Sequence, residues 1–133
     1  MKLGFTLIEL LIVIVLLGIA IALVGPLTIK QVENARARNE RQMLERWLHK
    51  QSFNAFAKQQ QYSFKFDGKA IYAIPQQPTE PEVVTVFNYL FFSPQHIVIN
   101  QNGYIQPDQL TFSINQREQH INLASLLTDK YEH

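Results

Sequence analysis

The N-terminal part of this 133-residue chain is almost uniformly apolar. Every residue from position 10 to position 24 is apolar or glycine, and residues 5–8 extend the run to about twenty if Glu9 is tolerated. At about 1.5 Å per residue, a helix of that length crosses a hydrocarbon layer about 30 Å thick. Residues 5–27 are therefore predicted to form a membrane-spanning helix.

A second helical pattern follows directly, with its apolar positions unevenly spread. No glycine or proline interrupts residues 27–61, and apolar side chains recur largely at three- and four-residue steps. The first half is mostly polar, and the apolar stripe becomes strong only from Met43. Residues 28–60 are predicted to form an amphipathic stem helix. Its second half packs on a head domain, and its first half stays free to contact neighbouring molecules.

Beyond residue 60 the period changes to two, which indicates β-strands. Aromatic and polar residues alternate over 62–66, and Asp67-Gly68 predicts a tight turn into a returning strand at 69–74. Three prolines make residues 75–81 a loop. Further strands are predicted at 83–92, 96–100, 104–106, 110–114 and 119–123, with turns at 101–103 and 115–118. The expected fold is α+β, with one long helix on a small antiparallel sheet that forms the head at 61–133.

The composition excludes some chemistry and shows a polarised charge. The chain has no cysteine, so it can form neither disulfides nor thiolate–metal sites. Net charge is +1, yet residues 28–69 carry nine Lys or Arg against four acids, while residues 70–133 carry two against six. A chain polarised in this way can stack its head against a neighbour in an assembly. Two solvated faces of different sign explain the charges equally well.

Glu9 is the anomaly of the apolar segment, because a carboxylate in a membrane span costs a few kcal/mol and needs a partner or a function. The stretch from Gly4 to Leu10, read Gly-Phe-Thr-Leu-Ile-Glu-Leu, follows a short leader with one basic side chain, Lys2. This arrangement resembles the class III signal sequence of type IV pilins and type II secretion pseudopilins. The resemblance covers about residues 2–27 and implies a pilin-like fold.

The resemblance also implies how the N-terminus is processed. Residues 1–4 would be a prepilin leader that a prepilin peptidase removes by cutting after Gly4, and the same enzyme would methylate the new N-terminal Phe5. Glu9 would then compensate the α-ammonium of a neighbouring subunit during docking, since opposite charges in hydrocarbon are tolerable together and costly apart. Pro26 falls where many family members have a helix-disrupting proline, so a helix break is expected there.

Topology and partners follow from the same resemblance. It places the protein in a bacterial inner membrane as a single-pass chain, with the head in the periplasm, contacting other pilin or pseudopilin subunits and an inner-membrane assembly platform. The positive-inside rule points the other way, because Lys2 stands alone on one flank of the span. The other flank carries Lys30, Arg36, Arg38 and Arg41. Peptidase access to Gly4 requires the family topology, which we therefore expect.

The order of the C-terminal strands resembles minor pseudopilins of the H type and one class of minor type IV pilins. Those proteins commonly have an Asp-Gly turn and a Gly-Gly-Thr-Leu strand. Here Asn102-Gly103 replaces the turn, and Asp108-Gln109-Leu110-Thr111 stands at the strand without the glycines. The resemblance implies a minor pilin or pseudopilin that serves protein transport or a pilus.

No pattern in the sequence predicts catalysis, a cofactor or a metal site. The pairs His49 with Glu45 and His120 with Glu118 offer two ligands each and are interpreted as surface pairs. No phosphate-binding glycine loop and no nucleophile motif is present. The chain is accordingly expected not to be an enzyme. The aromatic residues at 62, 64, 66, 87, 89, 91 and 92 are assigned to the core and sheet face of the head, in preference to a platform on which nucleic-acid bases stack.

Two other functions stay open. A minor pilin for DNA uptake in natural competence would share every N-terminal feature, and the stem is basic. Direct binding of nucleic acid is not expected, because Glu33, Glu40 and Glu45 interleave with the cations and predict a salt-bridged, solvated helix. A simple membrane-anchored periplasmic protein would keep Met1, or be cut after Ala22 by a signal peptidase.

Overall fold

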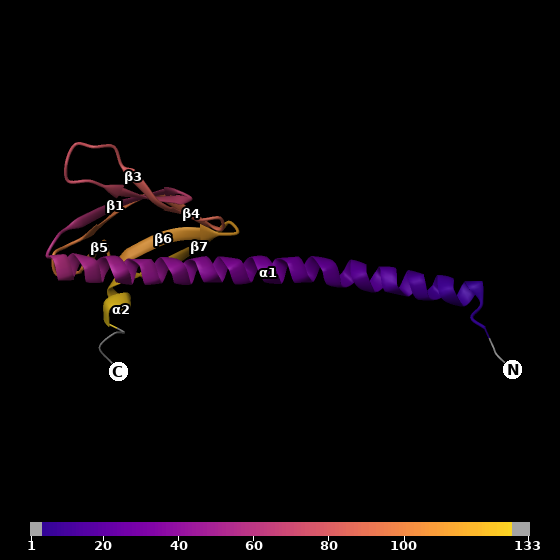
Figure 1. Ribbon diagram of the computed structural model, residues 1–133. Helices are drawn as coiled ribbons and strands as arrows, with labels where there is room; N and C mark the ends of the chain where they lie inside the picture. Colours follow the sequence, from indigo (N-terminus) through magenta and orange to yellow (C-terminus); the bar gives the residue numbers. More distant parts are fainter. Residues whose placement is uncertain (1–3, 129–133) are drawn as a thin grey trace. The chain divides into compact units, whose positions relative to one another are not determined.

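The computed structural model describes residues 4–128 and shows one long helix followed by a β-rich head (Figure 1). The elements are α1 (Leu7–Lys58), β1 (Tyr62–Gly68), β2 (Ala70–Ile74), β3 (Glu82–Val86), β4 (Leu90–Ile99), β5 (Ile105–Gln106), β6 (Gln109–Ile114), β7 (Arg117–Asn122) and α2 (Leu123–Thr128). The predicted α+β fold is confirmed: a long helix with an apolar N-terminal part is followed by an antiparallel sheet. The chain divides into two compact units, Met1–Ala35 and Arg36–His133, which are described separately.

The first unit is the N-terminal part of α1. None of its described residues is buried. The helix break expected at Pro26 does not occur, because α1 continues through this residue. Proline removes one main-chain donor from the helix. Close to it, the Thr28 hydroxyl donates a hydrogen bond of 3.0 Å to the Val24 carbonyl oxygen, which adds a local contact to this turn.

The second unit places the remainder of α1 on an antiparallel sheet. The strand order is β3-β2-β1-β4-β6-β7, and β5 pairs with β4. α1 buries one stripe at spacings of three, four and seven residues: Ala37, Leu44, Leu48, Ser52 and Ala55. This spacing keeps every buried side chain on one face of the helix.

Aromatic rings fill the space between the helix and the sheet. Phe66, Phe92 and Phe112 are fully buried, and the Trp47 ring of α1 lies 4.8 Å from the Phe64 ring, centroid to centroid, in edge-on packing. Edge-on aromatic pairs add to the free energy gained by burying their area. The interpretation of the aromatic residues at 62–66 and 87–92 as core and sheet face is confirmed for the four Phe residues at 64, 66, 87 and 92, while Phe91 is 52% exposed.

The helix ends by a backbone device that hydrophobic periodicity does not reveal. Gln59 adopts a left-handed conformation with φ of 54°, and the Gln60 N–H donates to the Ala55 carbonyl oxygen at 3.1 Å. This is the bond pattern of a Schellman-type helix end. The predicted stem end at residue 60 was therefore correct to within two residues.

The prediction of a single strand over 83–92 was wrong. β3 ends at Val86 and β4 begins only at Leu90. Between them the Phe87 N–H donates to the Lys69 carbonyl oxygen at 2.7 Å, and the next amides turn toward α1. β4 then continues to Ile99, so 96–100 is the end of β4 and no strand of its own.

The last helix, α2, was not predicted. Asn122 starts it, because its side-chain oxygen accepts hydrogen bonds from the N–H groups of Ala124 and Ser125 at 3.0 and 3.2 Å. Asparagine is a preferred residue at this position, where free amide groups need acceptors. The short return strand expected at 119–123 is instead β7, which begins two residues earlier, at Arg117.

Candidate processing and assembly site

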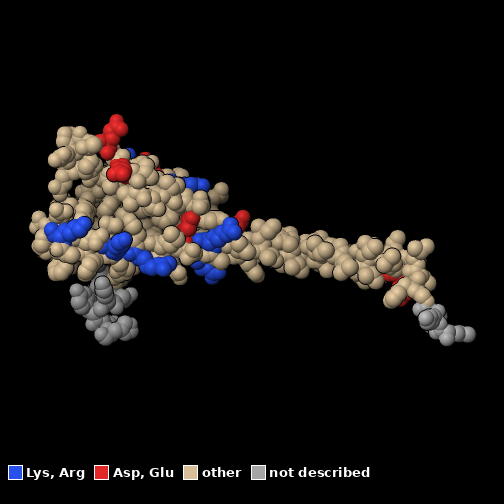
Figure 2. All heavy atoms as spheres, in the orientation of Figure 1, with Lys and Arg blue, Asp and Glu red and all other residues tan. Residues whose placement is uncertain are grey.

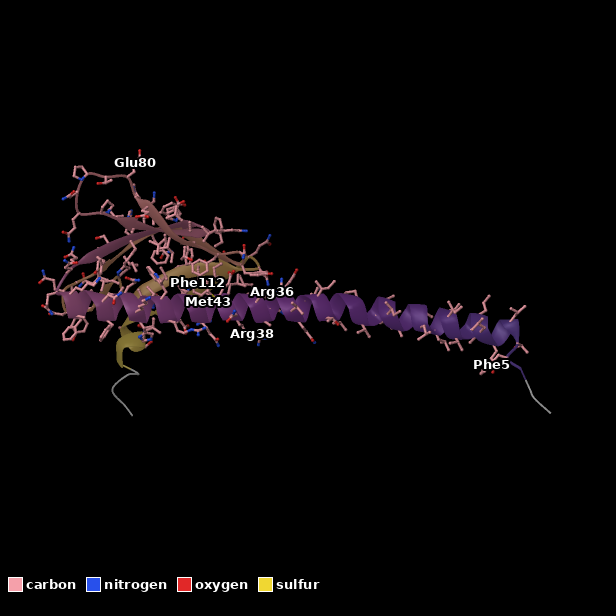
Figure 3. The ribbon with its side chains drawn as sticks, viewed as in Figure 1. Phe5, Arg36, Arg38, Met43, Glu80 and Phe112 are labelled. Carbon is pink, nitrogen blue, oxygen red and sulfur yellow. The ribbon has the colours of Figure 1, made fainter. Side chains whose placement is uncertain are left out.

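The predicted cleavage site lies ahead of the first helical turn. Residues 4–6 have no regular structure, α1 begins at Leu7, and Phe5 is 86% exposed (Figure 3). A Cβ atom added to Gly4 would meet no atom within 4 Å, and the backbone there is not left-handed. The fold of this chain therefore does not require glycine at position 4. If glycine is required at position 4, the requirement comes from another molecule that binds this segment.

Thr6 and Glu9 together start the helix. The Glu9 N–H donates to the Thr6 hydroxyl oxygen at 3.3 Å, and the Leu10 N–H donates to the Thr6 carbonyl oxygen at 3.2 Å. Thr-x-x-Glu is the sequence of a capping box, and an acid in the first turn also interacts favourably with the helix dipole. The spacing of Thr6 and Glu9 is thus a sequence signal for a helix start that hydropathy alone does not detect.

The apolar segment after Glu9 packs against no other part of the chain within residues 4–128. Its most apolar window has a mean hydropathy of 3.2, and none of that window is buried. The helix is long and apolar enough to cross a membrane, although an N-terminal signal sequence passes the same test. Within residues 4–128, Glu9 forms no ion pair.

The comparison with known families identifies this segment. A family model for the prokaryotic N-terminal methylation motif matches residues 1–25. Residues 1–25 therefore carry the N-terminal motif that marks type IV pilin-like prepilins. No curated protein and no solved structure matches the chain.

The motif confirms the coarse expectations drawn from the sequence. It implies processing by a prepilin peptidase and assembly with other pilins. Together with the apolar helix it indicates a membrane-anchored protein, and pilin-like proteins are structural rather than catalytic. The individual roles predicted for Gly4, Phe5 and Glu9 remain predictions.

Glu40 ties the second part of α1 to the head. Its carboxylate accepts hydrogen bonds from three consecutive backbone N–H groups, those of Asn88 at 2.9 Å, Tyr89 at 2.8 Å and Leu90 at 3.3 Å. Glu40 was expected to pair with cations on a solvated helix, and that expectation was wrong. These three amides, two in the β3–β4 connection and one at the first residue of β4, are stronger competitors for the carboxylate than exposed arginines, whose ion pairs are weak.

Arg41 makes the second polar contact between α1 and the head. Its Nε lies 3.3 Å from Glu45 Oε1, its Nη1 donates to Gln119 Oε1 at 3.0 Å, and its guanidinium carbon lies 5.8 Å from the centroid of the Phe112 ring. Glu45 therefore pairs with Arg41, whereas a pair with His49 was predicted. Of the two acids in this part of the stem, Glu40 binds amides of the head and Glu45 pairs with Arg41 of the same helix.

The other histidine pair exists as predicted. His120 Nε2 lies 3.5 Å from Glu118 Oε1, and His120 Nδ1 lies 3.1 Å from the Thr111 hydroxyl. Both side chains of the ion pair are more than half exposed, so it is an ordinary surface contact. Across residues 4–128, no group of three or more His, Cys, Asp or Glu side chains is arranged to hold a metal ion.

Proposed function

We propose that this chain is a minor pilin or pseudopilin, a structural subunit of a type II secretion pseudopilus or a type IV pilus. A prepilin peptidase would cut after Gly4 and methylate Phe5, and the apolar helix would then join the filament core. The head would face the periplasm. The observation that carries this proposal is the methylation motif at residues 1–25, in which residues 4–6 are exposed and precede the start of α1 at Leu7.

The exposed position of Gly4 supports cleavage there. Peptidases need an accessible, extended substrate, and residues 4–6 are exposed and outside the helix. A Gly4→Val variant should fold as the original does, because the added side chain has free space around it. It should accumulate as an unprocessed precursor, which mass spectrometry of the intact chain detects. A normally shortened chain in this variant would contradict cleavage after Gly4.

Glu9 has two separable roles, and one substitution distinguishes them. Glutamine also serves in a capping box, so Glu9→Gln keeps the helix start and removes only the charge. If the carboxylate compensates an α-ammonium in the membrane, Glu9→Gln and Glu9→Ala should insert normally and both fail to enter filaments. Normal incorporation of Glu9→Gln would show that capping suffices and would overturn the docking role.

A deletion in the native host would assign the machine. Lost exoprotein secretion with normal natural transformation would place the chain in a secretion pseudopilus. Lost transformation or twitching with normal secretion would place it in a type IV pilus, where a role in DNA uptake would follow. Normal secretion, twitching and transformation together would contradict a role in any of these filaments.

A further inference from the structure

The part of α1 that covers the sheet has a second face of mixed character, which we call the basic face: Arg38, Met43, Arg46, Lys50 and Phe56. All five residues are exposed, Met43 by 52% and Phe56 by 57%. Arg46 and Lys50 each follow a buried leucine by two residues, which places them about 200° around the helix from the core. Figure 2 shows Lys and Arg side chains along this part of α1, and Figure 3 shows Arg38 on the side turned away from the sheet.

The cations of the basic face are not neutralised by the helix they stand on. Glu40 is held by three backbone amides of the head, and Glu45 pairs with Arg41. Within residues 4–128, none of the three cations Arg38, Arg46 and Lys50 has an ion pair. Arg46 donates only to a backbone carbonyl of its own helix, at 3.3 Å, which leaves its charge unbalanced. The face is therefore suited to an anionic surface that also offers apolar side chains.

The same chain carries a surface of that kind, which we call the acidic edge: Glu80, Glu82, Val83, Val84 and Val86. It is formed by the outermost strand, β3, and the residues just before it. Its three valines are 52%, 41% and 63% exposed, and its two glutamates have no ion pair in the described part of the chain.

A hollow of about 420 Å³ opens beside these glutamates. Both glutamates line it, together with Tyr62, Gln61 and Gln76. Two carboxylates and an aromatic ring offer the contacts that an Arg or Lys side chain makes. The hollow is large enough for such a side chain and gives the acidic edge a place to receive it.

We propose that the acidic edge of one copy of this chain docks on the basic face of a second copy. Glu80 lies on the side of the head away from α1, so it does not reach the cations of its own helix (Figure 3). The two surfaces are different, so the contact is heterologous, and repetition of such a contact generates open filaments or rings. The proposal rests on the proposed filament function and names the surfaces through which the heads meet.

A second copy satisfies both components of the basic face. Carboxylates meet Arg46 and Lys50, while the valines of β3 cover Met43, which lies about one helical turn before Arg46, so charged and apolar surface are matched together. A DNA backbone offers phosphates for the cations but no aliphatic surface for the apolar side chains. The observations therefore favour protein over nucleic acid as the occupant.

The absence of cysteine allows a direct test, because introduced thiols are the only ones in the full chain. Two differently tagged populations are prepared in detergent, one with Met43→Cys and one with Val83→Cys, and treated with a short bifunctional thiol reagent. The proposal predicts a cross-linked dimer when the populations are mixed and little dimer in either population alone. Dimers of equal yield in the separate populations, or none in the mixture, would overturn it.

Charge reversal tests the chemistry of the contact. Arg46→Glu in one population, or Glu82→Arg in the other, should each lower the yield of mixed dimer about threefold to tenfold, and the two together should restore it. Arg117→Glu, at an exposed residue of β7, is the matched control and should leave the yield of mixed dimer unchanged. Salt of about 1 M, with a Debye length near 3 Å, should also weaken the contact. If Arg46→Glu does not change the yield of mixed dimer, or if the double reversal does not restore it, the pairing of the basic face with the acidic edge is contradicted.

Two further readouts separate the alternatives. In a gel-shift assay, the full chain could retard a duplex oligonucleotide while the Arg46→Glu variant does not. That result, without mixed dimers, would assign the basic face to nucleic acid and overturn the proposal. The N-terminus of each preparation is determined by mass spectrometry as well. If the host does not process the chain but mixed dimers form, the proposed filament function is refuted and the docking proposal stands. If the chain is processed and assembled but forms no mixed dimers, only the docking proposal is refuted.

Discussion

Replacing Glu40 should strongly destabilise the head, because its carboxylate is the acceptor for three backbone amides. In Glu40→Ala the N–H of Asn88 turns to water, since that residue is exposed. The N–H groups of half-buried Tyr89 and buried Leu90 lose their acceptor. A donor left without a partner costs about 1–3 kcal/mol. With partial access of water to Tyr89, we expect the free energy of unfolding to fall by about 2–4 kcal/mol.

Glu40→Gln refines the prediction. Glutamine keeps the length of the side chain and one acceptor oxygen, but it loses the charge that strengthens the hydrogen bonds. We expect this variant to lose about 1 kcal/mol, roughly the difference between a charge-assisted and a neutral hydrogen bond. The order of stability should be Glu40, then Gln, then Ala.

The chain provides its own probe for this measurement. Trp47 is the only tryptophan, and its ring packs against Phe64 between α1 and the sheet. Urea unfolding of the full chain in detergent can therefore be followed by Trp47 fluorescence, with the free energy extrapolated linearly to water. The matched control is Glu33→Ala, since Glu33 is exposed on the same helix and makes no hydrogen bond or ion pair within the described residues. Equal stability of the variants Glu40→Ala and Glu33→Ala would refute the reasoning.

Three further substitutions test other parts of the fold. Gly103→Ala should destabilise the head by about 2 kcal/mol more than Gly68→Ala. Both glycines have positive φ, but only a Cβ atom at position 103 would clash, because it would lie 2.9 Å from the Ser52 carbonyl oxygen. Equal losses of the free energy of unfolding in urea would contradict this. Leu48→Ala should lower the free energy of unfolding by about 2–5 kcal/mol in the same assay, since Leu48 is fully buried in the core. A loss below about 1 kcal/mol would mean that the helix does not pack on the sheet as described. Thr6→Ala should lower the protection of the first helical amides from hydrogen exchange by up to about tenfold, corresponding to about 1 kcal/mol, whereas Thr6→Ser should retain it; unchanged exchange in Thr6→Ala would exclude a capping role.

Elements dictated by local patterns were predictable from the sequence. The end of α1 was predicted to within two residues, because the apolar steps that include Leu44 and Leu48 are local and regular. Strands β1 and β6 followed from their alternation of apolar and polar residues in the same way. The processing motif at residues 1–25 is likewise a contiguous pattern, so the sequence alone was sufficient to identify it.

Features that depend on distant contacts were not predictable. The break between β3 and β4 is associated with a carboxylate 48 residues earlier in the chain, at Glu40, and no window of sequence around Asn88 contains it. The role of Glu40 was misjudged for the same reason, since its helical neighbours are cations and its real partners are amides of the head, whereas Glu45 does pair with a cation of its own helix, Arg41. At Pro26 the loss of one donor was taken for a break, but one lost hydrogen bond does not end a helix that is otherwise strongly apolar.

The central claim is that the chain is a prepilin processed at its N-terminus. The most direct measurement is mass spectrometry of the N-terminal peptide of the mature chain from its native host. The account predicts a chain that begins at Phe5 and carries one methyl group on its α-amino nitrogen. An intact Met1, or a chain that begins after Ala22, would contradict it.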